Sequence, residues 1–396
     1  MNQIRRIAFV TPRYGKEVIG GAEHAARMMA ENLSRVLGLS VEVLTTTALD
    51  TDTWDNHFPA GTEDLSGVKV IRHKIDMGRS KGFPMLSGRL LKYPKSATTE
   101  ECNQWIDAQG PVSCSLIEAI KDSTAQVILF FPYLYHPIVR GIAEVADRAV
   151  LIPAAHDEPP AYLPIFQNVF RSAKAIMFQS KAEEQFVDAV MRTADKPRLR
   201  AGLGIERYPV PPGPLSQHLP KLAGNPFLLT LGRVDQLKGA TLLSELFAEY
   251  KRRNPSPLKL VFAGPVTTQP IDFPDIMTLG TVGEELKWSL LAECTALVNP
   301  SAFESFSLVL FEAWSLSHPV IVNAQCQVTS DHVTDSGGGF VFSDFAEFES
   351  QVNLLLSNAD IRRALGSNGN RYLETNYRWE VIVQKIGIFL NDVFSS

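Results

Sequence analysis

Short apolar runs alternate with longer amphipathic segments along the first half of the chain. The run RIAFV at residues 6–10 precedes a loop and then residues 21–37, where apolar and small residues recur at helical spacing before Gly38. Further apolar runs of strand length follow at residues 40–46, 125–131, 149–155 and 173–180. Because short buried strands alternate with helices, the pattern predicts a parallel α/β sheet.

The alternation lapses once and then restarts. Residues 207–226 contain six prolines, too many for a helix or an inner strand, and predict an extended linker. Strand-like and helix-like segments alternate again from residue 227 to residue 377. We therefore predict an α/β protein of two Rossmann-like, doubly wound domains, residues 1–206 and 227–377, facing each other across a cleft.

Length and composition agree with two domains and exclude several classes of protein. A chain of 396 residues is too long for one hydrophobic core, and its net charge of −5 does not suggest nucleic-acid binding. No apolar run is long enough for a signal peptide or a membrane-spanning helix. Four scattered cysteines without a CxxC pair favour a reducing cytoplasm over a disulfide or zinc framework: Cys102, Cys114, Cys294 and Cys326.

Ligands of such sheets bind beyond the carboxyl ends of the strands, so the loops that follow strands are informative. The first loop ends in Gly20-Gly21, where small residues and a helix N-terminus would suit an anion or a simple tight turn. After the strand at residue 227, Arg233 and Lys238 precede a helix, and two cations at that position suit a diphosphate. Alternatively, Asp235 pairs with one of them.

Two carboxylates in the otherwise apolar segment 299–322 raise the question of what they bind. We predict that Ser307 caps a helix, that Glu304 lies in the loop before it, and that Glu312 lies inside it. Glu312 has apolar helical neighbours, so it is expected to bind a ligand or to pair with an arginine. The free N–H groups of Ser307, Leu308 and Val309 are expected to point toward the same ligand.

His156 follows an apolar run in the first half of the chain, beside Asp157 and Glu158. It is a candidate catalytic residue, with a structural role as the alternative. No set of histidines, cysteines or acids has metal-ligand spacing, so we predict no metal site. The acidic stretch Asp50–Asp52 is expected to be an exposed turn and Ser336–Phe340 a loop.

Together these motifs resemble the family 4 retaining glycosyltransferases, which have the GT-B fold. The family has a Glu-x7-Glu motif, matched by Glu304 and Glu312, and a GR…KG loop, matched by Arg233 and Lys238. Its N-terminal glycine loop is matched by Gly20-Gly21, and its histidine in the first domain by His156. The motifs occur in the family's order across nearly the whole chain.

The resemblance implies roles for these residues. Arg233 and Lys238 would hold the diphosphate of a UDP-, GDP- or other nucleotide-sugar donor, and Glu304 would contact the sugar. Glu312 would accept the ribose hydroxyls, and His156 would lie near the sugar and acceptor. The first domain would be the acceptor side, and the C-terminal helix, residues 378–396, would pack back on it. The chain departs from the family in reading ESFS for EGFG and GLGIE for the usual NG before the linker.

The expected reaction moves a sugar, of the hexosyl type, to an acceptor hydroxyl with retention of anomeric configuration and without a metal or other cofactor. Bacterial polysaccharide or glycolipid biosynthesis is the expected setting. The alternatives are a nucleotide-sugar 2-epimerase and a non-catalytic nucleotide-sugar binder; a glycosidase ranks last because it has no use for a diphosphate loop.

The segment Arg72–Lys95 contains seven Lys or Arg residues and one acid, interleaved with apolar side chains. Such a segment is either a solvated loop or a surface for an anionic membrane or a lipid-linked acceptor. We therefore expect a cytoplasmic protein, with peripheral association on the inner face of the membrane as the alternative to a free one.

Overall fold

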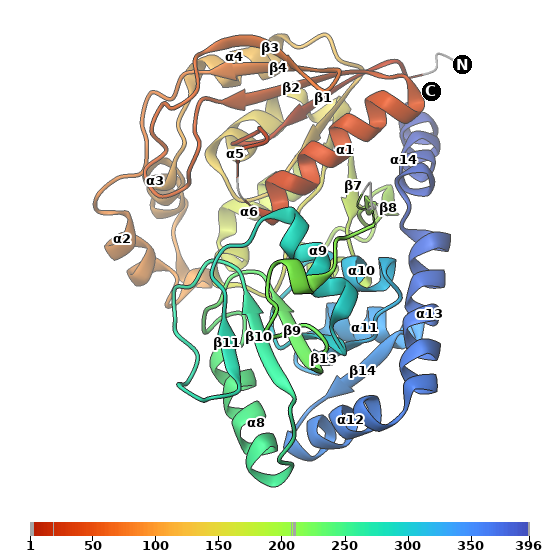
Figure 1. The fold of residues 1–396 in the computed structure, drawn as a ribbon. Coiled ribbons are helices and arrows are strands. Elements are labelled where there is room, and N and C mark those ends of the chain that lie inside the picture. The colour runs from red at the N-terminus through yellow and green to blue at the C-terminus, as the bar shows by residue number, and fades with distance from the viewer. Residues whose placement is uncertain (1–3, 19, 207, 209–210, 395–396) are drawn as a thin grey trace. The chain divides into compact units, whose positions relative to one another are not determined.

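The computed structural model describes residues 4–18, 20–206, 208 and 211–394 (Figure 1). The chain divides into two compact units. Unit 1 contains the residues up to Gly204 together with those from Trp379 onward, and unit 2 is Ile205–Arg378. Each unit is built on its own sheet, so each is described by itself.

The sheet of unit 1 has eight strands in the order β3-β4-β2-β1-β5-β6-β7-β8, all parallel except the edge strand β3 (Figure 1). Its strands are β1 Arg6–Val10, β2 Ser40–Thr46, β3 Gly61–Leu65, β4 Val68–His73, β5 Val127–Phe130, β6 Ala149–Leu151, β7 Ala175–Phe178 and β8 Arg198–Arg200. The inner strands are buried on both faces, as expected for parallel strands covered by helices.

Helices cover both faces of this sheet. They are α1 Gly21–Leu37, α2 Phe83–Leu90, α3 Thr99–Gln109, α4 Cys114–Asp122, α5 His136–Gly141, α6 Pro164–Ser172, α7 Lys181–Met191 and α14 Trp379–Phe394, with 3₁₀ turns η1 Pro94–Ser96, η2 Ile142–Arg148 and η3 Pro159–Tyr162. As predicted, α1 ends before Gly38, which adopts the left-handed conformation (φ 65°) and donates its N–H to the Ser34 carbonyl.

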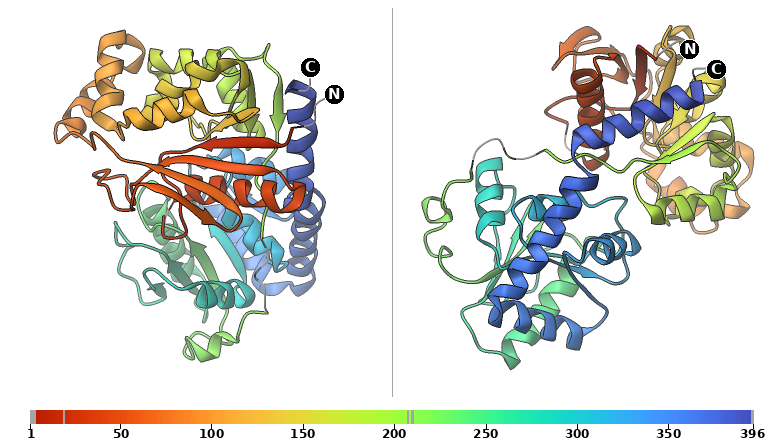
Figure 2. Two further views of the ribbon diagram at one scale, coloured as in Figure 1. Left: turned by 90° about the horizontal axis from the view of Figure 1, so that it is seen from above. Right: turned by 90° about the vertical axis from the view of Figure 1, so that its right-hand side faces the viewer.

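The last helix, α14, packs on α1 although the two helices are separated by most of the sequence (Figures 1 and 2). Gly387 permits this approach, because a Cβ there would lie 2.9 Å from Cδ1 of Leu37. Asn391 adds a polar contact, accepting the Ile4 N–H at 3.0 Å. The C-terminal helix is therefore part of unit 1, although the whole of unit 2 separates it in the sequence from the strands of unit 1.

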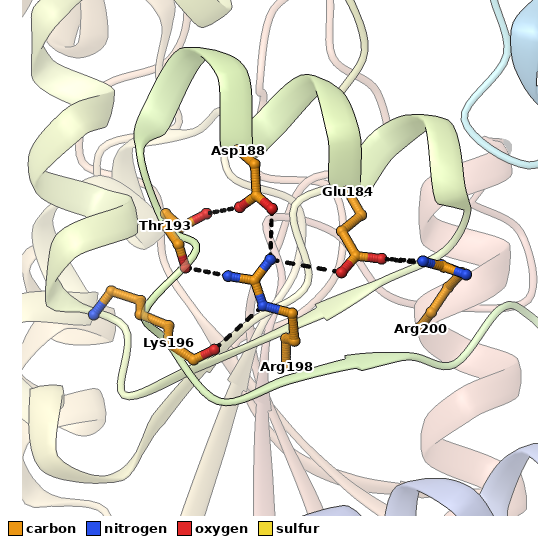
Figure 3. Close-up of polar contacts among 6 residues, drawn as sticks. All are labelled: Glu184, Asp188, Thr193, Lys196, Arg198 and Arg200. Atoms are coloured by element: carbon orange, nitrogen blue, oxygen red, sulfur yellow. Dashed lines mark hydrogen bonds and ion pairs between the residues drawn. The ribbon is translucent and has the colours of Figure 1, made fainter.

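An ion-pair network fixes the edge strand β8 to helix α7 (Figure 3). Arg198 contacts the carboxylates of Asp188 at 2.6 Å and Glu184 at 3.5 Å, and Arg200 contacts Glu184 at 2.5 Å. These ion pairs hold the short edge strand against helix α7 of the same unit. Charged side chains at a sheet edge also disfavour pairing with a second chain.

Unit 2 contains six strands in the order β11-β10-β9-β12-β13-β14, and every pair is parallel. The strands are β9 Phe227–Leu231, β10 Lys259–Ala263, β11 Ile276–Thr278, β12 Ala296–Asn299, β13 Val320–Asn323 and β14 Gly339–Phe342. The helices are α8 Ala240–Arg253, α9 Glu284–Glu293, α10 Leu308–Ser315, α11 Gln327–Ser336, α12 Phe345–Ser357 and α13 Ala359–Asn376, with a 3₁₀ turn η4 Leu215–Gln217.

The structure confirms the predicted fold class of two Rossmann-like α/β units and corrects three details. The glycine-rich stretch Ser336–Phe340 is not a loop, because Gly339 begins β14. Residues 211–226 of the predicted linker are partly packed on unit 2, where Leu215 and Leu222 are buried and the Leu215 N–H is donated to Glu293 at 2.7 Å. The third detail concerns the basic segment.

The segment Arg72–Lys95 is not one continuous loop. Arg72 belongs to β4, is 5% exposed, and donates to the Tyr14 carbonyl and to Glu63, both at 2.7 Å. A β3–β4 hairpin that the apolar pattern did not reveal therefore removes Arg72 from any surface role. Residues 83–90 form helix α2.

Candidate functional site

The strand order of unit 2 reverses between β9 and β12, its two central strands. In open α/β sheets this reversal leaves a crevice at the carboxyl ends of the strands, where ligands bind. The loop after β9, residues 232–239, carries Arg233 and Lys238. The loop after β12, residues 300–307, carries Glu304. The fold thus brings both predicted motifs to the two sides of one crevice.

Asp235 shapes the first of these loops. Its side chain is 12% exposed and accepts the backbone N–H of Lys238 at 2.7 Å, which closes the turn before α8. Its other carboxylate oxygen lies 3.5 Å from Nε of Arg233, whose side chain is 60% exposed. The expected pairing of Asp235 with one of the cations is therefore found for Arg233, in solvent, where such a pair is weak.

Gly239 lets the two loops touch. It adopts φ 77°, and a Cβ at this position would lie 2.5 Å from the Pro300 carbonyl oxygen. Only glycine meets both conditions without strain. The Lys238-Gly239 pair therefore lies directly against the start of the second loop.

Lys238 and Glu304 form an ion pair across the crevice, with Nζ 2.9 Å from Oε1. The Glu304 side chain is 14% exposed and that of Lys238 33%. Among the described residues, no hydrogen bond or ion pair involves the second oxygen of Glu304. The pair holds both groups in place and leaves one carboxylate oxygen and two ammonium donors for a ligand.

Two asparagines at strand ends hold the second loop. The side-chain amide of Asn299 donates to Ser307 Oγ at 2.7 Å and to Glu304 Oε1 at 3.4 Å. Asn323, at the end of the neighbouring strand β13, donates to the Pro300 carbonyl at 3.0 Å. Sequence reasoning missed both, although each ends an otherwise apolar strand, ALVN and VIVN, which is the signal that could have identified them.

Ser307 lies at the N-cap position of α10, as predicted, but it does not cap the helix. Its side chain makes no capping hydrogen bond, and its backbone is left-handed at φ 70° and ψ 69°. A non-glycine residue in this conformation costs roughly 1–2 kcal/mol, and such strain gathers at ligand sites. The first turn of α10, including Leu308 and Val309, has no side-chain cap. The N–H groups of Leu308 and Val309 are available for an anion, whereas that of Leu310 is donated to the Ser307 carbonyl at 3.2 Å.

A cluster of aromatic side chains packs against this strained turn. Phe306 is 2% exposed and stacks on Phe311 with ring centroids 4.7 Å apart. The rings of His332 and Tyr377 contact Phe306 at 5.2 and 5.5 Å. The buried Phe306, which ESFS has in common with EGFG, thus fixes the loop between Glu304 and Ser307, and the departures from the family pattern are Ser305 and Ser307.

Glu312 lies on the half-exposed face of α10 and pairs with a lysine of α9. Its Oε1 is 3.1 Å from Nζ of Lys287, which also lies 2.8 Å from Glu284. Burial raises the pKa of the Glu312 carboxyl, while Lys287 opposes that shift. The alternative of a structural partner is thus present, as a lysine instead of an arginine. The second oxygen of Glu312 has no bonded partner among the described residues.

In unit 1 an ion pair between two side chains of the chain lies against the predicted glycine loop. Gly20 is the N-cap residue of α1, and a Cβ there would lie 2.1 Å from the Glu23 carboxylate. Glu23, in the first turn of α1, pairs with Arg13 at 2.5 Å. Gly21 has open space around it. The need for glycine at residue 20 therefore follows from a buried ion pair.

His156 lies in the loop that follows β6, at the carboxyl edge of the sheet. Its Nε2 is 3.7 Å from Glu158 Oε2, and its side chain is 37% exposed. Glu158 in turn accepts a hydrogen bond from the hydroxyl of Tyr133 at 2.8 Å. Burial raises the pKa of Tyr133, so this hydroxyl remains a donor. His156 is thus a partly exposed imidazole, with its Nδ1 buried, beside a carboxylate that is itself held in place.

Glu183, which sequence reasoning missed, fixes the backbone before His156. This acid is 2% exposed and accepts the N–H groups of Ala155 at 2.8 Å and Gln179 at 2.6 Å. It thereby ties the loop after β6 to the start of α7, next to Ala154 with its positive φ of 53°. Burial raises the pKa of Glu183 to about 7 against the effect of these hydrogen bonds.

We expect Glu183 to make unit 1 less stable as pH rises from about 5 to 7. Between its unfolded pKa near 4.5 and its folded pKa near 7, the folded state holds a proton that the unfolded chain releases. A shift of that size lowers the free energy of unfolding by roughly 3 kcal/mol over the window and changes nothing above it. Urea denaturation at several pH values measures this dependence.

The comparison uses Glu183→Gln, which cannot titrate, and Glu144→Gln, which removes an exposed acid of the same unit. The wild-type and Glu144→Gln curves should share a slope that Glu183→Gln lacks. A constant difference between wild type and Glu183→Gln at every pH would contradict the assignment.

Within the described part of the chain, no group of histidine, cysteine and acidic side chains is arranged to hold a metal ion. In the same residues, no helix is both long and apolar enough to cross a membrane.

Residues 215–372 match the sequence profile of the family "Glycosyl transferases group 1", which covers most of unit 2. A stretch of 155 residues is 24% identical to a "Glycosyltransferase 1 domain-containing protein 1" from Xenopus tropicalis. That match includes 37% of this chain and 44% of the relative, so the chain spans less than half of its length.

Among solved structures, a sucrose-phosphate synthase from Thermosynechococcus elongatus aligns with a TM-score of 0.73 and 18% identity over 99% of both chains. The fold is GT-B. HepE of Anabaena, in complex with UDP and glucose, aligns with a TM-score of 0.64 and 16% identity, covering 98% of this chain and 100% of that one. At these identities the likeness shows the GT-B fold alone.

Proposed function

We propose that this protein is a retaining glycosyltransferase of family 4, which transfers a hexosyl group from a nucleotide-diphosphate sugar to an acceptor hydroxyl. The observation that carries the proposal is the Lys238–Glu304 pair across the crevice of unit 2. It places a cation and a carboxylate together beside an uncapped helix N-terminus. The match of residues 215–372 to group 1 glycosyl transferases supports the same activity.

The chemistry of sugar transfer explains why these groups stand together. Negative charge grows on the diphosphate as the glycosidic bond to the donor breaks. Lys238 and the N–H groups at the start of α10 form a fixed set of donors for that charge, and Arg233 can join them because its side chain is exposed. Such preorganised donors lower the barrier without requiring a metal ion.

Each glutamate retains an open carboxylate oxygen for the donor. We propose that Glu304 accepts a hydroxyl of the sugar and Glu312 the ribose hydroxyls, with Lys287 keeping Glu312 ionised. In unit 1, Gly20, Gly21 and His156 are proposed to serve the sugar and the acceptor. Glu158 and Glu183 would then orient the histidine.

A thermal-shift screen with UDP, GDP, ADP and their common sugars tests the proposal. A ligand that binds only the folded state stabilises it by about 2.7 kcal/mol at 100 times its Kd, which shifts the Tm of a domain of this size by roughly 5–10 °C. One nucleotide, with its sugars, should therefore stand apart from the others.

The same screen on Lys238→Met supplies the matched control, because the nucleotide that binds should lose most of its shift there. No shift with any nucleotide in the wild type would argue against the proposed function. A donor sugar that is inverted at C2 without an acceptor, as followed by NMR, would identify a 2-epimerase instead. A nucleotide sugar that binds but releases no nucleotide with any acceptor tried would identify a non-catalytic binder.

A further inference from the structure

Large apolar side chains and lysines share one exposed surface around α2 in unit 1. We call the α2 surface the set Met77, Lys81, Met85, Arg89, Lys92 and Tyr93. Met85 is 80% exposed, Tyr93 68% and Met77 55%. Large exposed hydrophobics are rare in the described chain, and a stretch of 17 residues carries these three. Figure 1 draws α2 at the outer edge of unit 1, beside α3.

The orientation of α2 accounts for this exposure. Phe83 and Leu90 face inward and are buried, with the Phe83 ring 5.5 Å from that of Trp105 in α3. The Trp105 indole N–H donates to Ser87 at 3.2 Å, which fixes the same inner face. At 100° per residue, Met85 and Arg89 then lie on the opposite side. The inner face of α2 makes the contacts with the hydrophobic core. The exposed Met85 therefore does not contribute to that core.

The charges around these apolar side chains are mostly positive. Lys81 and Lys92 are exposed and form no ion pair with any residue that the structure describes, and Arg89 lies 3.8 Å from Glu101 with its side chain 66% exposed. Asp76, the one acid of the segment, accepts the Cys114 N–H at 2.7 Å. The chain as a whole has a net charge of −5, so this basic surface runs against the overall charge.

We propose that the α2 surface docks unit 1 on an anionic lipid membrane. Lysine and arginine interact with anionic headgroups, while methionine and tyrosine side chains insert at the boundary of the headgroups and acyl chains. A nucleic acid would use the cations but not Met77 and Met85. An acidic protein partner would need a complementary shape, whereas a membrane needs none, and the position of α2 at the outer edge of unit 1 suits a flat surface (Figure 1).

Sedimentation of the full chain with vesicles tests the proposal independently of sugar transfer. Vesicles of phosphatidylcholine alone are compared with vesicles that also contain phosphatidylglycerol, at low and high salt. Each basic residue near an anionic membrane is worth roughly a fivefold change in partitioning. Lys81→Gln with Lys92→Gln should therefore weaken binding to the anionic vesicles about 25-fold, and Met85→Ser should weaken it as well.

Lys121→Gln with Lys181→Gln is the matched control, because it removes two exposed lysines of the same unit away from α2. This control should bind like the wild type. Equal sedimentation with neutral and anionic vesicles would overturn the proposal, as would equal losses in the two double variants. Binding of RNA that Lys81→Gln with Lys92→Gln abolishes, without any vesicle binding, would overturn it in favour of a nucleic-acid surface.

Discussion

Replacing Lys238 by methionine is expected to lower the kcat of sugar transfer by roughly 10²–10³-fold, the usual effect of losing one preorganised donor to a developing anion. Methionine keeps the apolar stem of the side chain and removes only the ammonium group. Because Lys238 contacts Glu304 at 2.9 Å, the change also leaves that carboxylate without its cation. Steady-state kinetics with the nucleotide sugar found by the thermal-shift screen measure the loss.

Arg233→Met is expected to lower turnover as well, by a smaller factor, since Arg233 is more exposed and already lies near Asp235. Lys221→Met, which removes an exposed lysine before β9, serves as the control and should behave like the wild type. Wild-type turnover in both the Lys238 and Arg233 variants would remove the diphosphate assignment. Similar unfolding midpoints for all variants would show that the losses do not come from misfolding.

Most of the fold could be predicted from the alternation of strand-like and helix-like segments along the sequence. Buried parallel strands such as VILF and VIVN are apolar on both faces, so a short apolar run between helical segments identifies them. The β3–β4 hairpin escaped because GTEDL is exposed and polar and lies at the sheet edge. Its partner, VKVIRH, alternates and ends in two basic residues, which joined it to the basic segment that follows.

The sequence predicts the parts of the candidate site whose residues lie together in one loop. The position of Lys238 before α8 follows from its sequence, and so does that of Glu304 before α10. That these two side chains meet follows only from the strand order, which places β9 beside β12 across many residues. The pairing of Asp235 with Arg233 could be expected because both lie in one loop, whereas the pairing of Glu304 with Lys238 joins two loops that are far apart in the sequence.

Residues that act through other residues were the hardest to foresee. Lys287 lies on α9, and a lysine on a helix is ordinarily solvated; only the packing of α9 against α10 brings it to Glu312. Glu183 lies in the first turn of α7, where acids are common for helix-dipole reasons. Its burial under the His156 loop has no counterpart in the local sequence.

Separate roles for the two glutamates are expected to give a crossed pattern of defects. Glu312→Gln keeps one acceptor but loses the charge, so it should weaken binding of the free nucleotide about tenfold or more, since charge-assisted hydrogen bonds contribute ~1.5–3 kcal/mol. Glu304→Gln should leave that affinity nearly unchanged and slow transfer instead. The free nucleotide discriminates between them because it has the ribose but lacks the sugar.

Calorimetry with the free nucleotide and single-turnover transfer are measured on both variants. Equal losses of nucleotide affinity would mean that the two roles cannot be divided in this way. No loss in either assay would mean that both carboxylates serve only their lysines, Lys238 and Lys287.

Lys287→Met extends this prediction to pH. Burial already raises the pKa of Glu312, and Lys287 counteracts the shift, so removing the ammonium group should raise that pKa further. A protonated Glu312 accepts ribose hydroxyls poorly. Nucleotide affinity should therefore begin to fall at a higher pH in Lys287→Met than in the wild type, while the two proteins converge in alkaline solution. If Lys287 instead only braces α9 against α10, its loss would weaken binding equally at every pH, because no proton would be linked to the nucleotide.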